Sequence, residues 1–316
     1  MSNSKGKIGV LVMSYGTPES MDDVEAYYTH IRRGNPPAPE QLQELKDRYV
    51  AIVGGVFPLR ENTNGQVAGL QDKLETLYPG SYACYQGLKH ARPYIEDGVE
   101  AMARDGITKA VGIVLAPHYS VMSVGTYIKR AKEKAAELGI DMDFVENYHL
   151  HPKLVEALRQ RVEDGLSVLA RGEAGSEPVK VLFSAHSLPE RIREMGDPYE
   201  KQLLETSDAV AKAANVTDWQ FTWQSAGRTR EPWLGPDILE TLAELQSQGV
   251  KAVLAAPIGF VSDHLEVLYD LDIEAKAEAA KRGIHLERIA MLNRDPLYME
   301  TLAESIVDVL SPKREE

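Results

Sequence analysis

The stretch VLVMSYGTP, residues 10–18, is matched without a gap by VLFSAHSLP at residues 181–189. Each copy begins as an apolar run typical of a buried strand and ends in a turn. The turn carries Tyr15 in the first copy and His186 in the second, so equivalent positions hold different polar rings. A second match, IVLAPHYS against VLAAPIGF, pairs two strands that end in Ala-Pro, which indicates that the two halves are one repeated unit.

Outside these stretches, short apolar runs alternate with longer amphipathic segments, a pattern typical of parallel α/β architecture. The predicted strands are 8–13, 81–86, 110–117 and 142–148 in the first half, and 179–186, 219–225, 251–257 and 286–292 in the second. The predicted helices between them include 66–77, 92–104, 126–138, 198–214 and 236–248. The sequence thus predicts two similar α/β domains, each with a four-stranded parallel sheet flanked by helices.

The predicted boundary between the two domains falls after the fourth strand. The first domain is expected to span 1–148 and the second 149–316, with a C-terminal helix at 296–310 that packs back on the first half. Ligands of parallel sheets bind beyond the carboxyl ends of the strands. Two such sheets that face each other would form an active cleft, with Tyr15 and His186 on its walls.

A helical insertion at 19–49 interrupts the first half and is predicted to form two helices around a Pro-rich turn. It carries aromatic and basic side chains: Tyr27, Tyr28, Arg32, Arg33, Arg48 and Tyr49. Such residues suit a flat, apolar ligand with carboxylates at its edge. An ordinary surface hairpin would carry the same residues, and the insertion alone does not distinguish the two.

The composition limits the partners and the compartment. A net charge of -13 is opposite to that of a protein that binds nucleic acid. The single cysteine, Cys84, excludes a disulfide framework or a cysteine-held iron–sulfur cluster and fits a reducing cytoplasm. The N-terminal apolar run is too short for a signal peptide, and no run is long enough to span a membrane. We therefore expect a cytoplasmic monomer.

Several common catalytic motifs are absent from the sequence, among them GxGxxG after a strand, GxxxxGK[ST], GxSxG and HExxH. His186 and Ser187 are neighbours in the chain, which is a poor geometry for a nucleophile and its base. His149 and His151 lie just before a proline at a strand exit and are interpreted as loop residues. The roles of His90 and His118, which follow strand ends in the first half, stay open.

An acidic stripe is the second distinctive feature. In DHLEVLYDLDIEAKAEAAKRG, residues 263–283, Glu266, Asp270 and Glu274 recur every four residues. The apolar residues between them predict a largely buried helix, and buried carboxylates must be paired, protonated or bound to metal. His264 would point away from Glu266 on such a helix.

His186 and Glu266 are expected at the same end of one sheet, because both follow the carboxyl ends of predicted strands. One imidazole and one carboxylate can hold a divalent transition metal weakly and can also accept protons. Weak and open coordination suits a metal that is handed on.

Motifs along most of the chain, in the same order, resemble those of the ferrochelatases. They are VLVMSYGTP, YYTHIRRG, LKDRY, GLKH, VLAPHYS, SAHSLPERI, GDPY, WQSAGRT, PWLGPD and GFVSDHLEVLYDLDIE. The sequence is most similar to the Gram-positive coproporphyrin ferrochelatases, which lack the membrane-binding lip and C-terminal iron–sulfur ligands of the animal enzymes. The resemblance implies two Rossmann-like, chelatase-type domains and a porphyrin cleft between them.

The resemblance also implies roles for single residues. The metal-site histidine of the family falls on His186 and its carboxylate on Glu266, while Asp270 and Glu274 match a line of acids that conducts metal or protons. Tyr15 matches the tyrosine that faces the porphyrin from the opposite side. The residues that correspond to the propionate contacts are Arg32, Arg48, Tyr49 and Tyr127. One position departs from the pattern, because Phe57 stands where some relatives have a serine.

The function implied is that of a lyase, the insertion of ferrous iron into a porphyrin during haem biosynthesis. Coproporphyrin III is the expected substrate, with protoporphyrin IX as the alternative. No permanently bound cofactor is expected, since Fe²⁺ is itself a substrate. A cobalt or nickel chelatase for another tetrapyrrole and a non-enzymatic porphyrin or haem carrier are the rival interpretations, although a carrier has no use for an acidic stripe.

Overall fold

The two matched stretches form equivalent strands of two separate sheets. The first stretch forms β1 (Ile8–Ser14), which pairs in parallel with β2 (Tyr82–Leu88) and β3 (Lys109–Val114). The second forms β5 (Val179–His186), which pairs in parallel with β6 (Trp219–Gln224) and β7 (Ala252–Ala256). The last strands are β4 (Asp141–Val145) and β8 (His285–Arg288). The sheet orders, β2-β1-β3-β4 and β6-β5-β7-β8, are the same, and the prediction of two four-stranded parallel sheets is confirmed.

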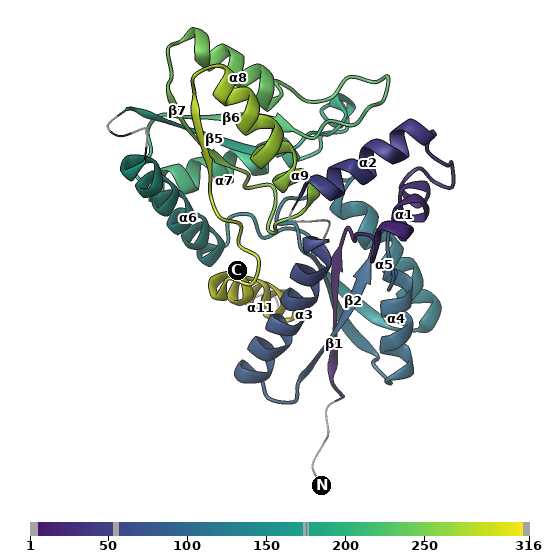
Figure 1. Cartoon of the computed structure of the whole chain (residues 1–316). Coiled ribbons are helices and arrows are strands. Elements are labelled where there is room, and N and C mark those ends of the chain that lie inside the picture. The colour runs from purple at the N-terminus through teal and green to yellow at the C-terminus, as the bar shows by residue number, and fades with distance from the viewer. Residues whose placement is uncertain (1–5, 53–56, 173–174, 176, 312–316) are drawn as a thin grey trace. The chain divides into compact units, whose positions relative to one another are not determined.

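The computed structural model describes residues 6–52, 57–172, 175 and 177–311. It divides into two units (Figure 1), of which the first contains the residues up to Tyr148 and those from Asn293 onward. The second unit is His149–Leu292. The last helix, α11 (Pro296–Leu310), therefore belongs to the first unit, where it packs against α3 (Pro58–Leu77) and β4.

The first sheet is covered by helices on both faces. The helices α4 (Ile95–Arg104) and α5 (Val124–Leu138) pack on one face, and α3 and α11 pack on the other (Figure 1). Strand β1 is therefore buried almost throughout, as the continuous apolar run of a central parallel strand requires. The insertion after β1 contains η1 (Met21–Asp23), α1 (Val24–Ile31) and α2 (Pro39–Ala51), and α1 packs against α2.

The second sheet is covered in the same way. The helices α6 (Pro152–Arg171) and α7 (Tyr199–Ala213) pack together and against β6, β7 and β8. The opposite face is covered by α8 (Ile238–Ser247), α10 (Lys276–Lys281) and the helical turns that precede α10, whose apolar side chains share one cluster with Leu182 and Val253. Within the described part of the chain, no helix combines the length and hydropathy that a membrane span needs.

Candidate active site

His186 is the last residue of β5, at the carboxyl end of the second sheet. Its backbone is held by the hydroxyl of Tyr199, which donates to the His186 carbonyl at 3.1 Å. Its ring Nδ1 lies within hydrogen-bonding distance of the carbonyl oxygen of Ser187, so Nδ1 carries the proton. A ring that is held in this way presents Nε2 as its metal ligand or base.

Glu266 lies in α9 (Leu265–Leu268), the first helical turn after β7. Its Oε1 is 3.5 Å from Nε2 of His186, and its Oε2 is 3.7 Å from Nε2 of His264. The carboxylate therefore lies between two imidazoles. The side chains of His186 and Glu266 are 31% and 34% exposed, so a ligand can reach them.

The prediction that His264 points away from Glu266 is wrong. His264 is not part of the helix but precedes it as the N-cap residue, with an extended backbone at φ -158° and ψ -179°. Helical periodicity therefore does not govern the direction of its side chain, and its ring also packs on Phe260, with ring centroids 4.7 Å apart.

Buried hydrogen bonds join the elements that carry His186 and Glu266. Gln224, at the end of β6, donates from Nε2 to the backbone carbonyl of Glu266 at 3.2 Å. The Gln224 Oε1 accepts a hydrogen bond of 2.8 Å from the hydroxyl of Ser184 on β5. Both Ser184 and Gln224 are fully buried, so these bonds are protected from competing water.

His186 and Glu266 change each other's protonation. Burial lowers the pKa of His186, but the Glu266 carboxylate outweighs burial and raises the pKa to about 9. Burial likewise raises the pKa of Glu266, and the imidazole of His186, followed by that of His264, outweighs it and holds the pKa well below its usual range. At neutral pH the pair is therefore an imidazolium and a carboxylate, and a metal that binds Nε2 must displace a proton.

The acids that follow Glu266 do not lie on a regular α-helix, which corrects the predicted single helix over 263–283. Residues Asp270–Ala275 (η4) form a π-helix, in which the N–H of Glu274 donates to the carbonyl of Tyr269, five residues back, at 2.9 Å. The three acids differ in exposure. They run from the partly exposed Glu266 to the buried Asp270 and the exposed Glu274.

Arg288 binds two other acids of this segment. Its guanidinium binds Asp272 through Nε at 2.9 Å and Nη2 at 2.8 Å, and its Nη2 also lies 3.2 Å from Asp263. Asp270, in contrast, accepts a hydrogen bond from the hydroxyl of Ser225. Sequence reasoning did not single out Arg288. The available signal was a basic residue inside a predicted strand, shortly after the acidic stretch.

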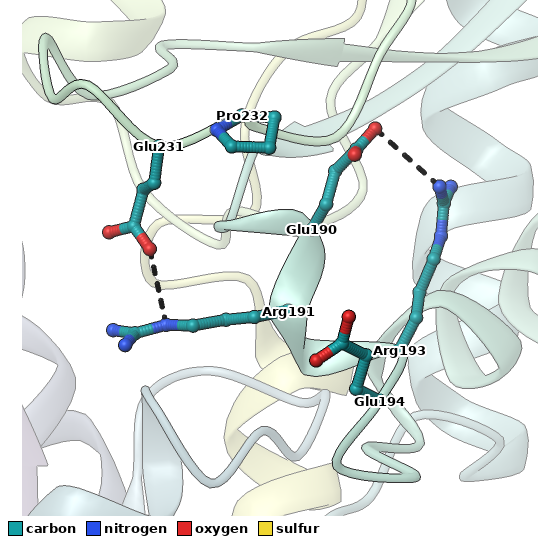
Figure 2. Close-up of a pocket in the computed structure, with 6 residues that line it drawn as sticks. All are labelled: Glu190, Arg191, Arg193, Glu194, Glu231 and Pro232. Atoms are coloured by element: carbon teal, nitrogen blue, oxygen red, sulfur yellow. Dashed lines mark ion pairs between the residues drawn. The ribbon is translucent and has the colours of Figure 1, made fainter.

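A pocket elsewhere in the second unit has a different character. Glu190, Arg191, Arg193, Glu194, Glu231 and Pro232 line it (Figure 2). Arg191 pairs with Glu231 at 3.3 Å and Arg193 pairs with Glu190 at 3.7 Å. Its charges thus largely neutralise each other, and it contains neither His186 nor Glu266.

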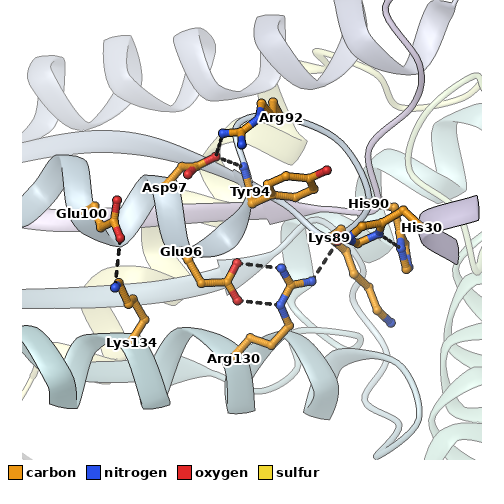
Figure 3. Close-up of polar contacts among 10 residues, drawn as sticks. All are labelled: His30, Lys89, His90, Arg92, Tyr94, Glu96, Asp97, Glu100, Arg130 and Lys134. Carbon is orange, nitrogen blue, oxygen red and sulfur yellow. Dashed lines mark hydrogen bonds and ion pairs between the residues drawn. The ribbon is translucent and has the colours of Figure 1, made fainter. Parts of the chain in front are cut away.

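In the first unit, Tyr15 follows β1 and is 41% exposed. Its ring packs on the ring of His90, with centroids 4.6 Å apart, and its carbonyl accepts a hydrogen bond of 3.0 Å from the N–H of His90. The Nδ1 atoms of His90 and His30 lie 3.0 Å apart (Figure 3). Burial, followed by the charge of Lys89, lowers the pKa of His90 to about 3, so this ring is neutral at pH 7.

Lys89 is a candidate ligand-binding residue that sequence reasoning missed. Its Nζ lies 4.8 Å from the ring centroid of Tyr127, a predicted site residue that is almost fully buried. Burial and the charges of Arg130 and Arg33 lower the pKa of Lys89 to about 8, with no opposing carboxylate among the residues that the structure describes. A half-buried cation in a cationic environment favours an anionic ligand. The GLKH motif includes Lys89, but the motif does not show which residues surround it in the fold.

The other predicted porphyrin-binding residues lie on or beside the insertion. Arg32 donates from Nε to the carbonyl of Asn35 at 3.2 Å and lies over the ring of Tyr28. Tyr49 is 3% exposed and packs on Phe57, with ring centroids 4.7 Å apart. Arg48 precedes Tyr49 in α2 and is partly buried. The predicted metal residues all belong to the second unit, and the predicted porphyrin residues all belong to the first.

Comparisons with known proteins show the family of the chain. The family described as Ferrochelatase matches residues 7–310. The Coproporphyrin III ferrochelatase of Bacillus subtilis (strain 168) is 45% identical over 310 residues, which cover 97% of this chain and 99% of the relative. That of Oceanobacillus iheyensis is 46% identical over 305 residues, 96% of this chain and 97% of the relative.

Solved structures with a similar fold are more distant in sequence. The sirohydrochlorin chelatase SirB of Bacillus subtilis subspecies spizizenii, in complex with cobalt, gives a TM-score of 0.57 at 13% identity and covers 96% of this chain and 95% of its own. The structure of CbiX gives a TM-score of 0.52 at 11% identity, with 96% and 100% covered. At such identities the likeness concerns the fold alone.

Proposed function

Since the chain belongs to the ferrochelatase family, we propose that it inserts ferrous iron into coproporphyrin III during haem biosynthesis. The observation that carries the proposal is the His186–Glu266 pair, an imidazole and a carboxylate 3.5 Å apart at a strand end. Three relatives that are 45%, 46% and 45% identical to this chain are named Coproporphyrin III ferrochelatase, which supports the choice of substrate.

The reaction sets two demands on these residues. As Fe²⁺ enters the macrocycle, two pyrrole N–H protons must leave, so that charge and atoms balance. His186 and Glu266 together provide a ligand set for the incoming ion and two groups that accept a proton once the ion has moved on. Asp270, which is buried, and Glu274, which is exposed, follow Glu266 at intervals of four residues, which supports a path for metal or protons.

The first unit supplies groups that suit the porphyrin. Tyr15 and His90 offer stacked rings, while Arg32, Arg48 and Lys89 offer positive charge for propionates. Residues that hold the ring by its edge would favour a saddled macrocycle, whose nitrogen lone pairs point at the metal. Phe57 cannot make the side-chain contact of a serine, and a backbone amide can take that role.

The chain itself supports a reaction without an iron–sulfur cluster. Its one cysteine, Cys84, has a pKa that burial raises to about 12, which makes it a poor metal ligand. The same low cysteine content supports a protein of the cytoplasm.

The test is an anaerobic mixture of the protein with Fe²⁺ and either coproporphyrin III or protoporphyrin IX, followed by the loss of free-porphyrin fluorescence. We expect fast loss with coproporphyrin III, slower loss with protoporphyrin IX, and none with His186→Ala, which should still bind the porphyrin.

A matched control is His285→Ala. His285 forms an equally long pair with Glu287, 3.5 Å, at the opposite end of a strand in the same unit, and its loss should leave the rate unchanged. Normal turnover by His186→Ala would refute the site. Tight binding of iron porphyrin without insertion of Fe²⁺, Co²⁺ or Ni²⁺ would identify a carrier, and insertion of Co²⁺ or Ni²⁺ alone would identify a different chelatase.

A further inference from the structure

Two ion pairs connect the neighbouring helices α4 and α5, one helical turn apart (Figure 3). Glu100 pairs with Lys134 at 2.9 Å. Glu96 pairs with Arg130 through two hydrogen bonds, from Nε at 2.8 Å and from Nη2 at 2.6 Å. The two pairs bridge the same helices in the same register, so they make the same kind of contribution to the packing of α4 on α5.

Of these two pairs, the one formed by Arg130 also contacts the turn after β2. The third nitrogen of the guanidinium, Nη1, donates a hydrogen bond of 2.8 Å to the carbonyl oxygen of Lys89. Glu96 occupies the other two nitrogens and so fixes the plane of the guanidinium, which directs Nη1 at that carbonyl. A lysine at this position has no such planar fork and cannot serve both partners with the same geometry.

The turn that Arg130 holds is attached on its other side to β1. The N–H of Lys89 donates to the carbonyl of Ser14 at 2.9 Å, and the N–H of His90 donates to the carbonyl of Tyr15 at 3.0 Å. The backbone of Lys89 and His90 is therefore clamped between the end of β1 and α5. This clamp places the Lys89 ammonium over Tyr127 and the His90 ring against Tyr15.

We propose that Arg130, fixed by Glu96, is a positioning residue that holds Lys89 and His90 in place for the carboxylate-bearing edge and the face of the tetrapyrrole. The inference rests on the proposed function, because it assumes that the ligand of the first unit is a porphyrin. Arg130 acts through the turn and not through contact with the substrate.

The test compares Arg130→Met and Glu96→Gln with the control variants Lys134→Met and Glu100→Gln, all in the full chain. Two quantities are measured with coproporphyrin III: the Kd without iron, by porphyrin fluorescence, and the KM and kcat for Fe²⁺ insertion. Removing a charge-assisted hydrogen bond predicts a rise in Kd and KM of roughly tenfold for Arg130→Met, and a smaller rise for Glu96→Gln. The controls should stay within about twofold of the wild type.

The conservative variant and a double variant separate positioning from folding. Arg130→Lys keeps the charge and the pair with Glu96, and it should fold like the wild type yet leave KM raised. In a Lys89→Met background, the loss of Arg130 should raise KM less than it does in the wild type.

Equal KM changes in the Arg130 and Lys134 variants, or full rescue by Arg130→Lys, would overturn the positioning role. If the wild type neither binds nor metallates coproporphyrin III, the proposed function itself has failed. If the wild type is active but the Kd and KM of the Arg130 variants match those of the control variants, this inference alone has failed.

Discussion

The Nε2 atom of His186 lies 3.5 Å from Oε1 of Glu266, although one residue ends a strand and the other begins a helix after a different strand. Glu266 is also 3.7 Å from His264, so one carboxylate serves two imidazoles. This arrangement leaves both side chains accessible, as the proposed transfer of a transition metal requires.

The His186–Glu266 pair should make the free energy of unfolding of the metal-free protein depend on pH. Glu266 has a lowered pKa, so its contribution is present above the pKa of an unfolded glutamate, about 4.3, and is lost as the pH falls toward the folded pKa. His186 has a raised pKa, so its contribution is complete below about 6.5, the pKa of an unfolded histidine, and is lost as the pH rises through about 9.

We therefore expect Glu266→Gln to cost most stability between about pH 5 and 6.5 and least above about pH 9. Urea unfolding of the wild type and of Glu266→Gln, without metal and at about pH 5.5 and about pH 9.5, measures the difference in the free energy of unfolding. A cost that is the same at about pH 5.5 and about pH 9.5 would show that the pair does not form.

A divalent metal should stabilise the folded protein through His186. With Co²⁺ at about ten times its Kd, binding predicts a gain of about 1.4 kcal/mol in the free energy of unfolding. Thermal unfolding with and without Co²⁺ measures the gain, and the visible absorption of Co²⁺ reports its ligands. His186→Ala should lose the gain and His285→Ala should keep it, whereas retention in both variants would place the metal elsewhere.

Arg288 should support the geometry of Glu266, because it binds Asp263 and Asp272 on either side of that residue. Its side chain is only 11% exposed, so Arg288→Met leaves two aspartates without their cation and should cost about 2–3 kcal/mol of stability. Iron insertion should slow as well. Lys276→Met, which breaks a pair of 3.1 Å with Glu287 between the same segments, is the control and should change the rate little.

Lys89 should discriminate between porphyrins by the number of their carboxylates. Lys89→Met removes a cation that no described carboxylate neutralises, so it should weaken coproporphyrin III binding by roughly tenfold and protoporphyrin IX binding less. The ratio of the two Kd values, from fluorescence titrations, is the measurement. An unchanged Kd for both porphyrins would remove Lys89 from the binding site.

Much of the fold could be predicted because it depends on local patterns. The apolar runs located all eight strands that the structure describes, most clearly the central ones, since a central parallel strand is buried on both faces and must be apolar throughout. Boundaries were less accurate: the runs predicted at 110–117 and 286–292 extend beyond β3 and β8, because apolar residues continue into the turns after these strands. The π-helix could not be predicted, since it depends on how the segment packs.

The sequence by itself determined the repeated α/β unit, the identity of the imidazole and the acids, and the family, because these depend on residue types and their order. Only the tertiary structure decided that His264 turns toward Glu266, that Arg288 takes two of the acids, and that Arg130 grips the turn of Lys89. Such contacts join residues far apart in the chain, and their pKa values depend on burial and neighbouring charge, which exist only once the chain has folded.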